Sequence, residues 1–250
     1  MRTRFNLNLA TLDRFTVVVQ GLYATGKTHL LGDMLRHESA SGPVRFCNSE
    51  GEDGWMTISG MGLGEIGETV QTFKDMQDYI ADCRKEKVHA LAVDSLRPMF
   101  NAVFMEVVGD QRLPDPKLDG DRSKALWGMA AFKMEQFLRL MRTAANSVVA
   151  SVPSAKTDVE GGGKTIAPDL YGRMAQASIG CFDFAGYLTA RMLGPGKVER
   201  KISFAPRVDV LNRQRLVRPV TQDILIPDSG GGWEAIKAAF QRGMAKEATP

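Results

Sequence analysis

An eight-residue segment between a predicted strand and a predicted helix constrains the fold of this 250-residue chain more than any other feature. Residues Phe15–Gln20 (FTVVVQ) form a β-branched run typical of buried parallel strands. Residues Lys27–His37 repeat leucine and methionine along one helical face. Between them, Gly21–Thr28 (GLYATGKT) matches the pattern G-x-x-x-x-G-K-[ST] at every fixed position. A strand, this loop and a helix in that order predict the first unit of a parallel α/β sheet.

The loop has the chemistry of a phosphate-binding site. Its glycines let backbone N–H groups and the helix N-terminus come close to phosphate oxygens. We expect Lys27 to contact the β and γ phosphates of a nucleotide, and the hydroxyl of Thr28 to ligate Mg²⁺. The alternative is a chance match in a glycine-bearing turn. The predicted nucleotide-binding residues are Gly21, Leu22, Tyr23, Ala24, Thr25, Gly26, Lys27, Thr28 and His29.

A carboxylate for the magnesium shell is expected at the end of another buried strand. Residues Ala90–Val93 are apolar and Asp94 follows them, so Asp94 is the candidate metal residue. The alternative reading of Asp94 is a turn residue or a helix cap, because Ser95 and Pro98 come next. The chain has no guanine-specific N-K-x-D motif, which favours ATP as the nucleotide.

Strands alternate with helices as far as residue 152, which predicts an α/β fold with a mainly parallel sheet flanked by helices. Closely spaced strands predicted after residue 182 indicate an antiparallel, β-rich C-terminal extension. We expect a short segment at 1–14, one core at 15–218, and a final strand, helix and tail at 219–250.

Composition argues against several other classes of protein. The three cysteines, Cys47, Cys83 and Cys181, are far apart and form no C-x-x-C pair, so neither a disulfide framework nor a zinc site is predicted. No apolar run is long enough to span a membrane, and the first twelve residues lack the apolar core of a signal peptide. We expect a protein of a reducing cytoplasm that does not enter membranes.

With the loop and Asp94 in this order, the chain resembles the RecA-like core ATPases. It is most similar to the phage-type nucleotide-binding proteins, some of which are ATP-dependent single-strand annealing proteins of the Sak type. The likeness runs from about Phe15 to Arg215. It implies a RecA-like core that uses ATP and Mg²⁺ and assembles as a homo-oligomer. It also implies single-stranded DNA and other replication or recombination proteins as partners, in a bacterial or phage-infected cell.

The same resemblance assigns roles to individual residues. Glu50 follows a predicted strand at the position of the family's catalytic glutamate, which implies a general base acting on water near the γ phosphate. The alternative for Glu50 is a solvated loop acid beside Glu52 and Asp53. The strand Ser147–Val152 is implied to lie between the loop strand and the Asp94 strand. The histidine or glutamine usual after it is missing, and Ser154 is the candidate substitute.

Near residue 213 the family often has a Lys-x-Arg pattern, in which this chain has leucine in place of the lysine. Arg213 or Arg215 is therefore a candidate finger that reaches the γ phosphate of a neighbouring subunit. Either arginine is also compatible with a surface position or a DNA contact.

Nucleic-acid contacts are harder to place from the sequence. Residues 109–124 and 154–167 are predicted loops of mixed charge, whereas residues 191–218 contain eight basic and two acidic residues. A solvated hairpin face explains that basic excess equally well. The candidate nucleic-acid residues are Lys156, Lys164, Arg200 and Lys201.

Three functional hypotheses follow. The first is an ATPase of recombination, annealing or repair that acts on single-stranded DNA. The second is a nucleotide-gated assembly or switch protein with little hydrolysis and no direct role at DNA. The third is a small-molecule kinase, which the late position of the basic segment disfavours because kinases of this fold place an arginine-rich lid over the phosphates.

Overall fold

The computed structural model describes residues 15–49, 51–109, 116–159, 163–171, 174–207, 209–214, 216 and 219–244. In chain order its elements are β1 (Phe15–Gly21), α1 (Lys27–Glu38), β2 (Val44–Ser49), α2 (Gly54–Gly60), η1 (Gly64–Ile66), β3 (Gly67–Val70), α3 (Phe73–Lys85), β4 (Ala90–Asp94), α4 (Leu96–Val108), α5 (Pro116–Met141), β5 (Ser147–Val159), β6 (Gly163–Pro168), α6 (Met174–Cys181), β7 (Phe184–Gly194), β8 (Lys197–Ser203), β9 (Arg213–Gln214), β10 (Ile224–Ile226) and α7 (Gly232–Met244).

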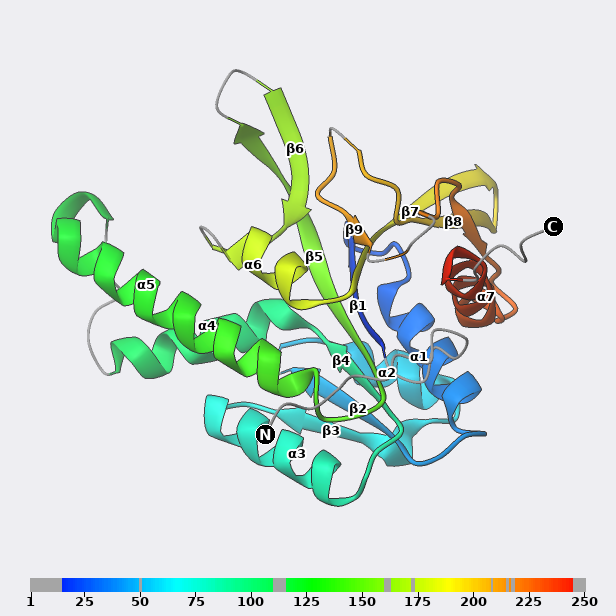
Figure 1. The fold of residues 1–250 in the computed structure, drawn as a ribbon, viewed down its shortest axis with the longest axis horizontal. Coiled ribbons are helices and arrows are strands. Elements are labelled where there is room, and N and C mark those ends of the chain that lie inside the picture. Colours follow the sequence, from blue (N-terminus) through cyan, green and yellow to red (C-terminus); the bar gives the residue numbers. More distant parts are fainter. Residues whose placement is uncertain are drawn as a thin grey trace.

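The strands form one sheet in the order β10-β8-β7-β1-β5-β4-β2-β3, with β6 paired to β5 and β9 paired to β7 (Figure 1). Neighbours from β7 through β3 run parallel, whereas β8 and β10 extend the sheet antiparallel beyond β7. The predicted α/β fold with a mainly parallel sheet and an antiparallel C-terminal extension is confirmed. Strand β5 lies between β1 and β4, as the resemblance implied.

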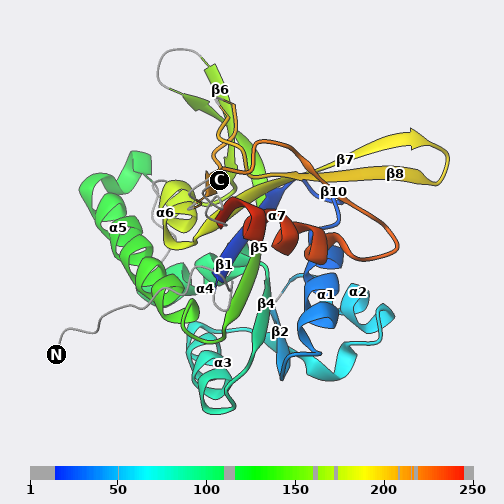
Figure 2. The ribbon, with the colours of Figure 1, turned by 45° about the vertical axis from the view of Figure 1, so that its right-hand side comes forward.

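Helices cover both faces of the sheet because the central strands are apolar on both sides. In β1, Val18 packs with the residues of α3, α4, α5 and α6, whereas Val17 and Val19 pack with those of α1 and α7. Figure 2 shows α3, α4 and α5 on one side of the sheet and α1, α2 and α7 on the other. Alternate residues of one strand thus hold the two helical layers in place.

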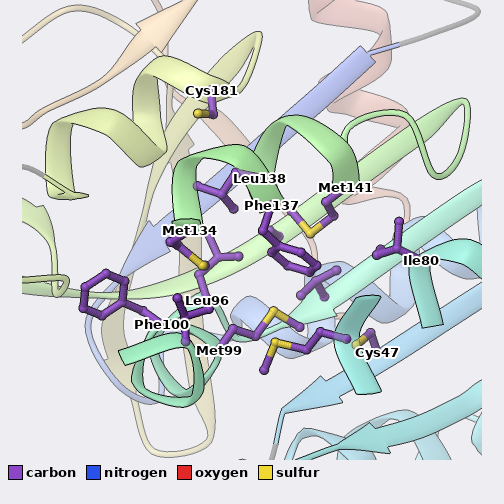
Figure 3. Packing of buried hydrophobic residues seen from close by; sticks show 14 of the residues in the cluster. Cys47, Ile80, Leu96, Met99, Phe100, Met134, Phe137, Leu138, Met141 and Cys181 are labelled. Atoms are coloured by element: carbon purple, nitrogen blue, oxygen red, sulfur yellow. The ribbon is translucent and has the colours of Figure 1, made fainter. Parts of the chain in front are cut away.

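Helices α4 and α5 supply most of the packing on the first face. Leu96, Met99 and Phe100 of α4 lie opposite Met134 and Phe137 of α5 (Figure 3), and all five side chains are buried. This packing fixes α4, and with it the segment that leads out of β4 at the edge of the sheet.

Two segments predicted as loops contain regular structure, and so does the stretch that follows β2. Residues 49–67 include α2 and η1, and residues 116–124 belong to α5, in which Gly120 has a non-helical φ of 49° where two helical pieces meet. Residues 154–159 and 163–167 pair as the antiparallel hairpin of β5 and β6. Glycine and polar content suggested loops, but β-branched residues on both hairpin strands and a proline at the start of α5 favour the elements found.

The C-terminal helix α7 is joined to α1 through buried charge. Glu38 accepts hydrogen bonds from Trp233 Nε1 and Lys237 Nζ, both at 2.8 Å, and its other oxygen lies 3.0 Å from His89 Nε2. Asp33 of α1 accepts the backbone N–H of Trp233 at 2.8 Å. Because Glu38 is buried, these partners replace the water it loses on folding.

Across the part of the chain that the structure describes, no helix combines the length and the apolar character that a membrane span requires.

The Glu38 cluster predicts how stability depends on pH. Burial alone would raise the pKa of Glu38, but hydrogen bonds from Lys237 and Trp233, with the charge of Lys237, lower it from 4.5 to about 2. A carboxyl group with a lowered folded-state pKa stabilises the fold above its unfolded pKa, and this contribution is lost as the pH falls from 4.5 to about 2. We expect the free energy of unfolding to fall by about 3 kcal/mol through this group across that window.

Urea unfolding of the wild type and of Glu38→Gln between roughly pH 5 and pH 2 measures this contribution. At the upper end of this pH range, Glu38→Gln should have a lower free energy of unfolding than the wild type. Its free energy of unfolding should also lose most of the pH dependence assigned to Glu38. The control is Glu234→Gln, at an exposed position of α7, which should keep the wild-type profile. A Glu38→Gln profile parallel to the wild type would contradict the assignment.

Candidate functional site

The carboxyl ends of β1 and β4 meet at one edge of the sheet, on either side of β5, and a cavity of about 330 Å³ opens there. It is lined by the loop after β1, by residues 52–57 after β2, by Asp94 and Ser95 after β4, and by Pro153 of β5. The structure therefore brings together the glycine-bearing loop and the carboxylate that the sequence analysis predicted independently. Such an edge is where open α/β sheets usually bind ligands.

The loop needs glycine at two positions, Gly26 and Gly21. Gly26 has a φ of 93°, a left-handed conformation that is strained for other residues. Ala24, which is not a glycine, also has a positive φ, of 60°. A methyl group on the Cα of Gly21 would lie 2.7 Å from the carbonyl oxygen of Leu188 in β7. The loop is thus folded tightly against β7 and turns its backbone toward the start of α1.

Lys27 bends back over this loop. Its Nζ donates to the carbonyl oxygens of Gly21, at 3.0 Å, and Leu22, at 2.8 Å, and lies 5.8 Å from the centre of the Tyr23 ring. Burial lowers the pKa of Lys27 below its ordinary 10.5, while the charges of Asp94 and Glu52 act in the opposite direction. The ammonium group is therefore held among neutral acceptors with two acids nearby.

Asp94 is the most enclosed acid of the site, with 4% of its surface exposed. One carboxylate oxygen accepts a hydrogen bond from Thr28 Oγ1 at 2.5 Å, and the other accepts from Ser151 Oγ of β5. The peptide bond between Asp94 and Ser95 is cis. A methyl group on the Cα of Gly54 would lie 2.5 Å from Asp94 Oδ2, so α2 begins directly against this carboxylate.

Glu52 is a site residue that the sequence analysis missed, since it named Glu52 only as a neighbour of Glu50. Its Oε1 accepts a hydrogen bond from Ser95 Oγ at 2.8 Å, beside Asp94. Burial raises the pKa of Glu52; the Ser95 hydrogen bond opposes this and the charge of Asp94 adds to it. The available signal was Gly54, which permits the chain after β2 to approach Asp94.

The other predicted nucleotide-binding residues have different surroundings. Tyr23, with 73% of its surface exposed, lies at the rim with Ala24, and His29 lines the cavity from α1. Thr25 turns inward and donates from Oγ1 to the Leu22 carbonyl oxygen at 2.9 Å. These contacts shape the loop around Lys27.

The predicted catalytic residues from other segments are not all gathered here. Glu50 and Arg215 lie outside the described residues. Arg213, on β9, donates to the carbonyl oxygen of Gly180 at 2.8 Å and is not among the residues that line the cavity. Ser154 is buried and donates to Gln20 Oε1 at 3.5 Å, so its hydroxyl is directed to β1.

The four candidate nucleic-acid residues divide into two groups. Lys156 and Lys164 are exposed on the hairpin of β5 and β6. Lys201 and Arg200 lie on β8 and are only partly exposed, the first paired with Glu199 at 2.8 Å and the second with Asp228.

The sequence of this chain matches no protein-family model, and no curated protein matches it.

The close approach of Gly54 to Asp94 gives a prediction for the site. In Gly54→Ala the added methyl group must displace a carboxylate that two hydroxyl groups hold in place. We expect the free energy of unfolding to fall by about 1–3 kcal/mol, as for other overpacked sites.

Gly60→Ala is the matched control, because a methyl group at this last residue of α2 meets nothing within 4 Å. That variant should be as stable as the wild type or more stable by up to about 1 kcal/mol. Chemical denaturation measures both. Equal effects of the two substitutions would show that Gly54 is not constrained by Asp94.

Proposed function

We propose that this chain is a P-loop NTPase with a RecA-like core, which binds ATP with Mg²⁺ at Gly21–Thr28 and hydrolyses it. One observation carries the proposal: the Lys27 amine, the Thr28 hydroxyl and the Asp94 carboxylate converge in a single cavity at the carboxyl edge of the sheet. A loop of this pattern between a strand and a helix, with an acid at the end of a neighbouring strand, is the arrangement that phosphoryl-transfer sites use.

The residues fit a magnesium nucleotide. Lys27 donates to two neutral carbonyl oxygens of its own loop, which makes it available to phosphate oxygens of higher charge. Thr28 Oγ1 and Asp94 Oδ2, 2.5 Å apart, are oxygen donors of the kind that Mg²⁺ prefers. When bound, Mg²⁺ neutralises charge on the phosphates. The start of α1 directs backbone N–H groups toward the same region.

A base for hydrolysis is present in the same cavity. Glu52 is half-buried, is oriented by Ser95 Oγ, and has a pKa raised by burial, which makes its carboxylate a stronger base. We assign it the role of taking a proton from the attacking water. The family resemblance implied this role for Glu50 instead, and substitution of each residue separates the two assignments.

Action on single-stranded DNA is the further part of the proposal. It rests on the resemblance and on the exposed cations Lys156 and Lys164 of the β5–β6 hairpin. A nucleotide-gated switch with little hydrolysis is the second candidate. The observation that favours it is Ser154, whose hydroxyl contacts Gln20 at the position where the family usually has a sensor residue.

The decisive test is ATP hydrolysis measured with and without single-stranded DNA. We expect DNA to stimulate turnover of the wild type, and Glu52→Gln to lower turnover by roughly 10²- to 10⁴-fold while ATP binding is retained. The control is Glu65→Gln, an exposed acid of η1 that does not line the cavity, which should hydrolyse ATP as the wild type does.

Two other outcomes have definite meanings. Loss of turnover in Glu50→Gln but not in Glu52→Gln would return the base to Glu50. Tight ATP binding without turnover, indifferent to DNA, would overturn the ATPase assignment and support the nucleotide-gated switch.

A further inference from the structure

Arg200 lies against the glycine-bearing loop, although it belongs to β8 in the C-terminal extension. A methyl group on the Cα of Gly26 would lie 2.7 Å from Arg200 Nε and 3.0 Å from its Cδ. Gly26 immediately precedes Lys27, at the turn into α1. The guanidinium group therefore packs on the backbone of the same segment that would hold the nucleotide phosphates.

This guanidinium group is only partly satisfied. Arg200 Nη1 forms an ion pair with Asp228, which follows β10, but among the described residues Nε is buried without a hydrogen-bond partner. A buried donor without a partner is costly, and an arginine fork carries five N–H groups. The site thus has donor capacity beyond what Asp228 uses.

The two members of the ion pair differ in exposure. The side chain of Arg200 is 21% exposed, whereas that of Asp228 is 57% exposed. Asp228 can therefore return to water at little cost, but Arg200 needs another anion if it leaves Asp228. A phosphate group held at Gly26 would be such an anion, and arginine binds phosphate through two parallel hydrogen bonds.

We infer that Arg200 binds the phosphates of the nucleotide from within the same chain, exchanging the Asp228 carboxylate for phosphate oxygens. This inference rests on the proposed function and deepens it, because it adds a cation of the C-terminal extension to the phosphate site. It also separates Arg200 from Lys156 and Lys164, which are exposed on the β5–β6 hairpin.

The exchange predicts opposite behaviour for the two partners of one ion pair. Removal of Arg200 removes a phosphate ligand, so Arg200→Gln should weaken binding of fluorescent ATP with Mg²⁺ by roughly ten- to a hundredfold. Removal of the competing carboxylate frees the guanidinium group, so Asp228→Asn should bind ATP as tightly as the wild type or more tightly. A merely structural ion pair would make both variants less stable and change their affinities in the same direction.

Fluorescence titration of the full chain measures these affinities, and thermal unfolding checks that each variant is folded. Lys201→Gln is the matched control: it removes the neighbouring β8 cation, which pairs with Glu199, and should leave affinity unchanged. If Arg200→Gln does not fold, Asp228→Asn carries the test, and weaker binding by it overturns the inference.

Affinity of Arg200→Gln equal to that of the wild type would overturn this inference and leave the proposed function standing. A wild type that binds no ATP would overturn the proposed function itself, and the role of Arg200 with it.

Discussion

Asp94 is a buried carboxylate that accepts hydrogen bonds from the hydroxyl groups of Thr28, which ends the glycine-bearing loop, and Ser151 of β5. The rest of the site is arranged around this carboxylate. A carboxylate with so little exposure is tolerated only where its oxygens are hydrogen-bonded, so Thr28 and Ser151 hold the ends of three adjacent strands in register. Gly54 allows α2 to begin against the same carboxylate and so brings Glu52 into the cavity. The position of one acid thus decides where the cation, the hydroxyl and the second acid lie.

Two cations from distant parts of the chain lie against the glycine-bearing loop. Lys27 reaches back over the loop from α1, and Arg200 of β8 packs against Gly26 with 21% of its side chain exposed. The antiparallel extension therefore packs against the glycine-bearing loop as well as lengthening the sheet. Helix α7 adds stability to this extension, because Glu38 and Asp33 of α1 hold its first turns.

The sequence predicted the elements whose signals are local. The apolar run of β1, the helical spacing of α1 and the acid after Ala90–Val93 each lie within a few residues, and all three were placed correctly. Glu52 was not named as a site residue and Arg200 was named only as a nucleic-acid candidate, because their contacts with Ser95 and Gly26 arise only in the tertiary fold. The hairpin of β5 and β6 was missed because glycine and charge outweighed its β-branched residues in the sequence pattern.

A crystal structure with Mg²⁺ and a non-hydrolysable ATP analogue tests the central claim most directly. We expect the triphosphate to lie along Gly21–Thr28, with Lys27 Nζ moved from the Gly21 and Leu22 carbonyl oxygens to phosphate oxygens and the metal held at Thr28 and Asp94. A nucleotide bound elsewhere, with Lys27 still on those carbonyl oxygens, would contradict it.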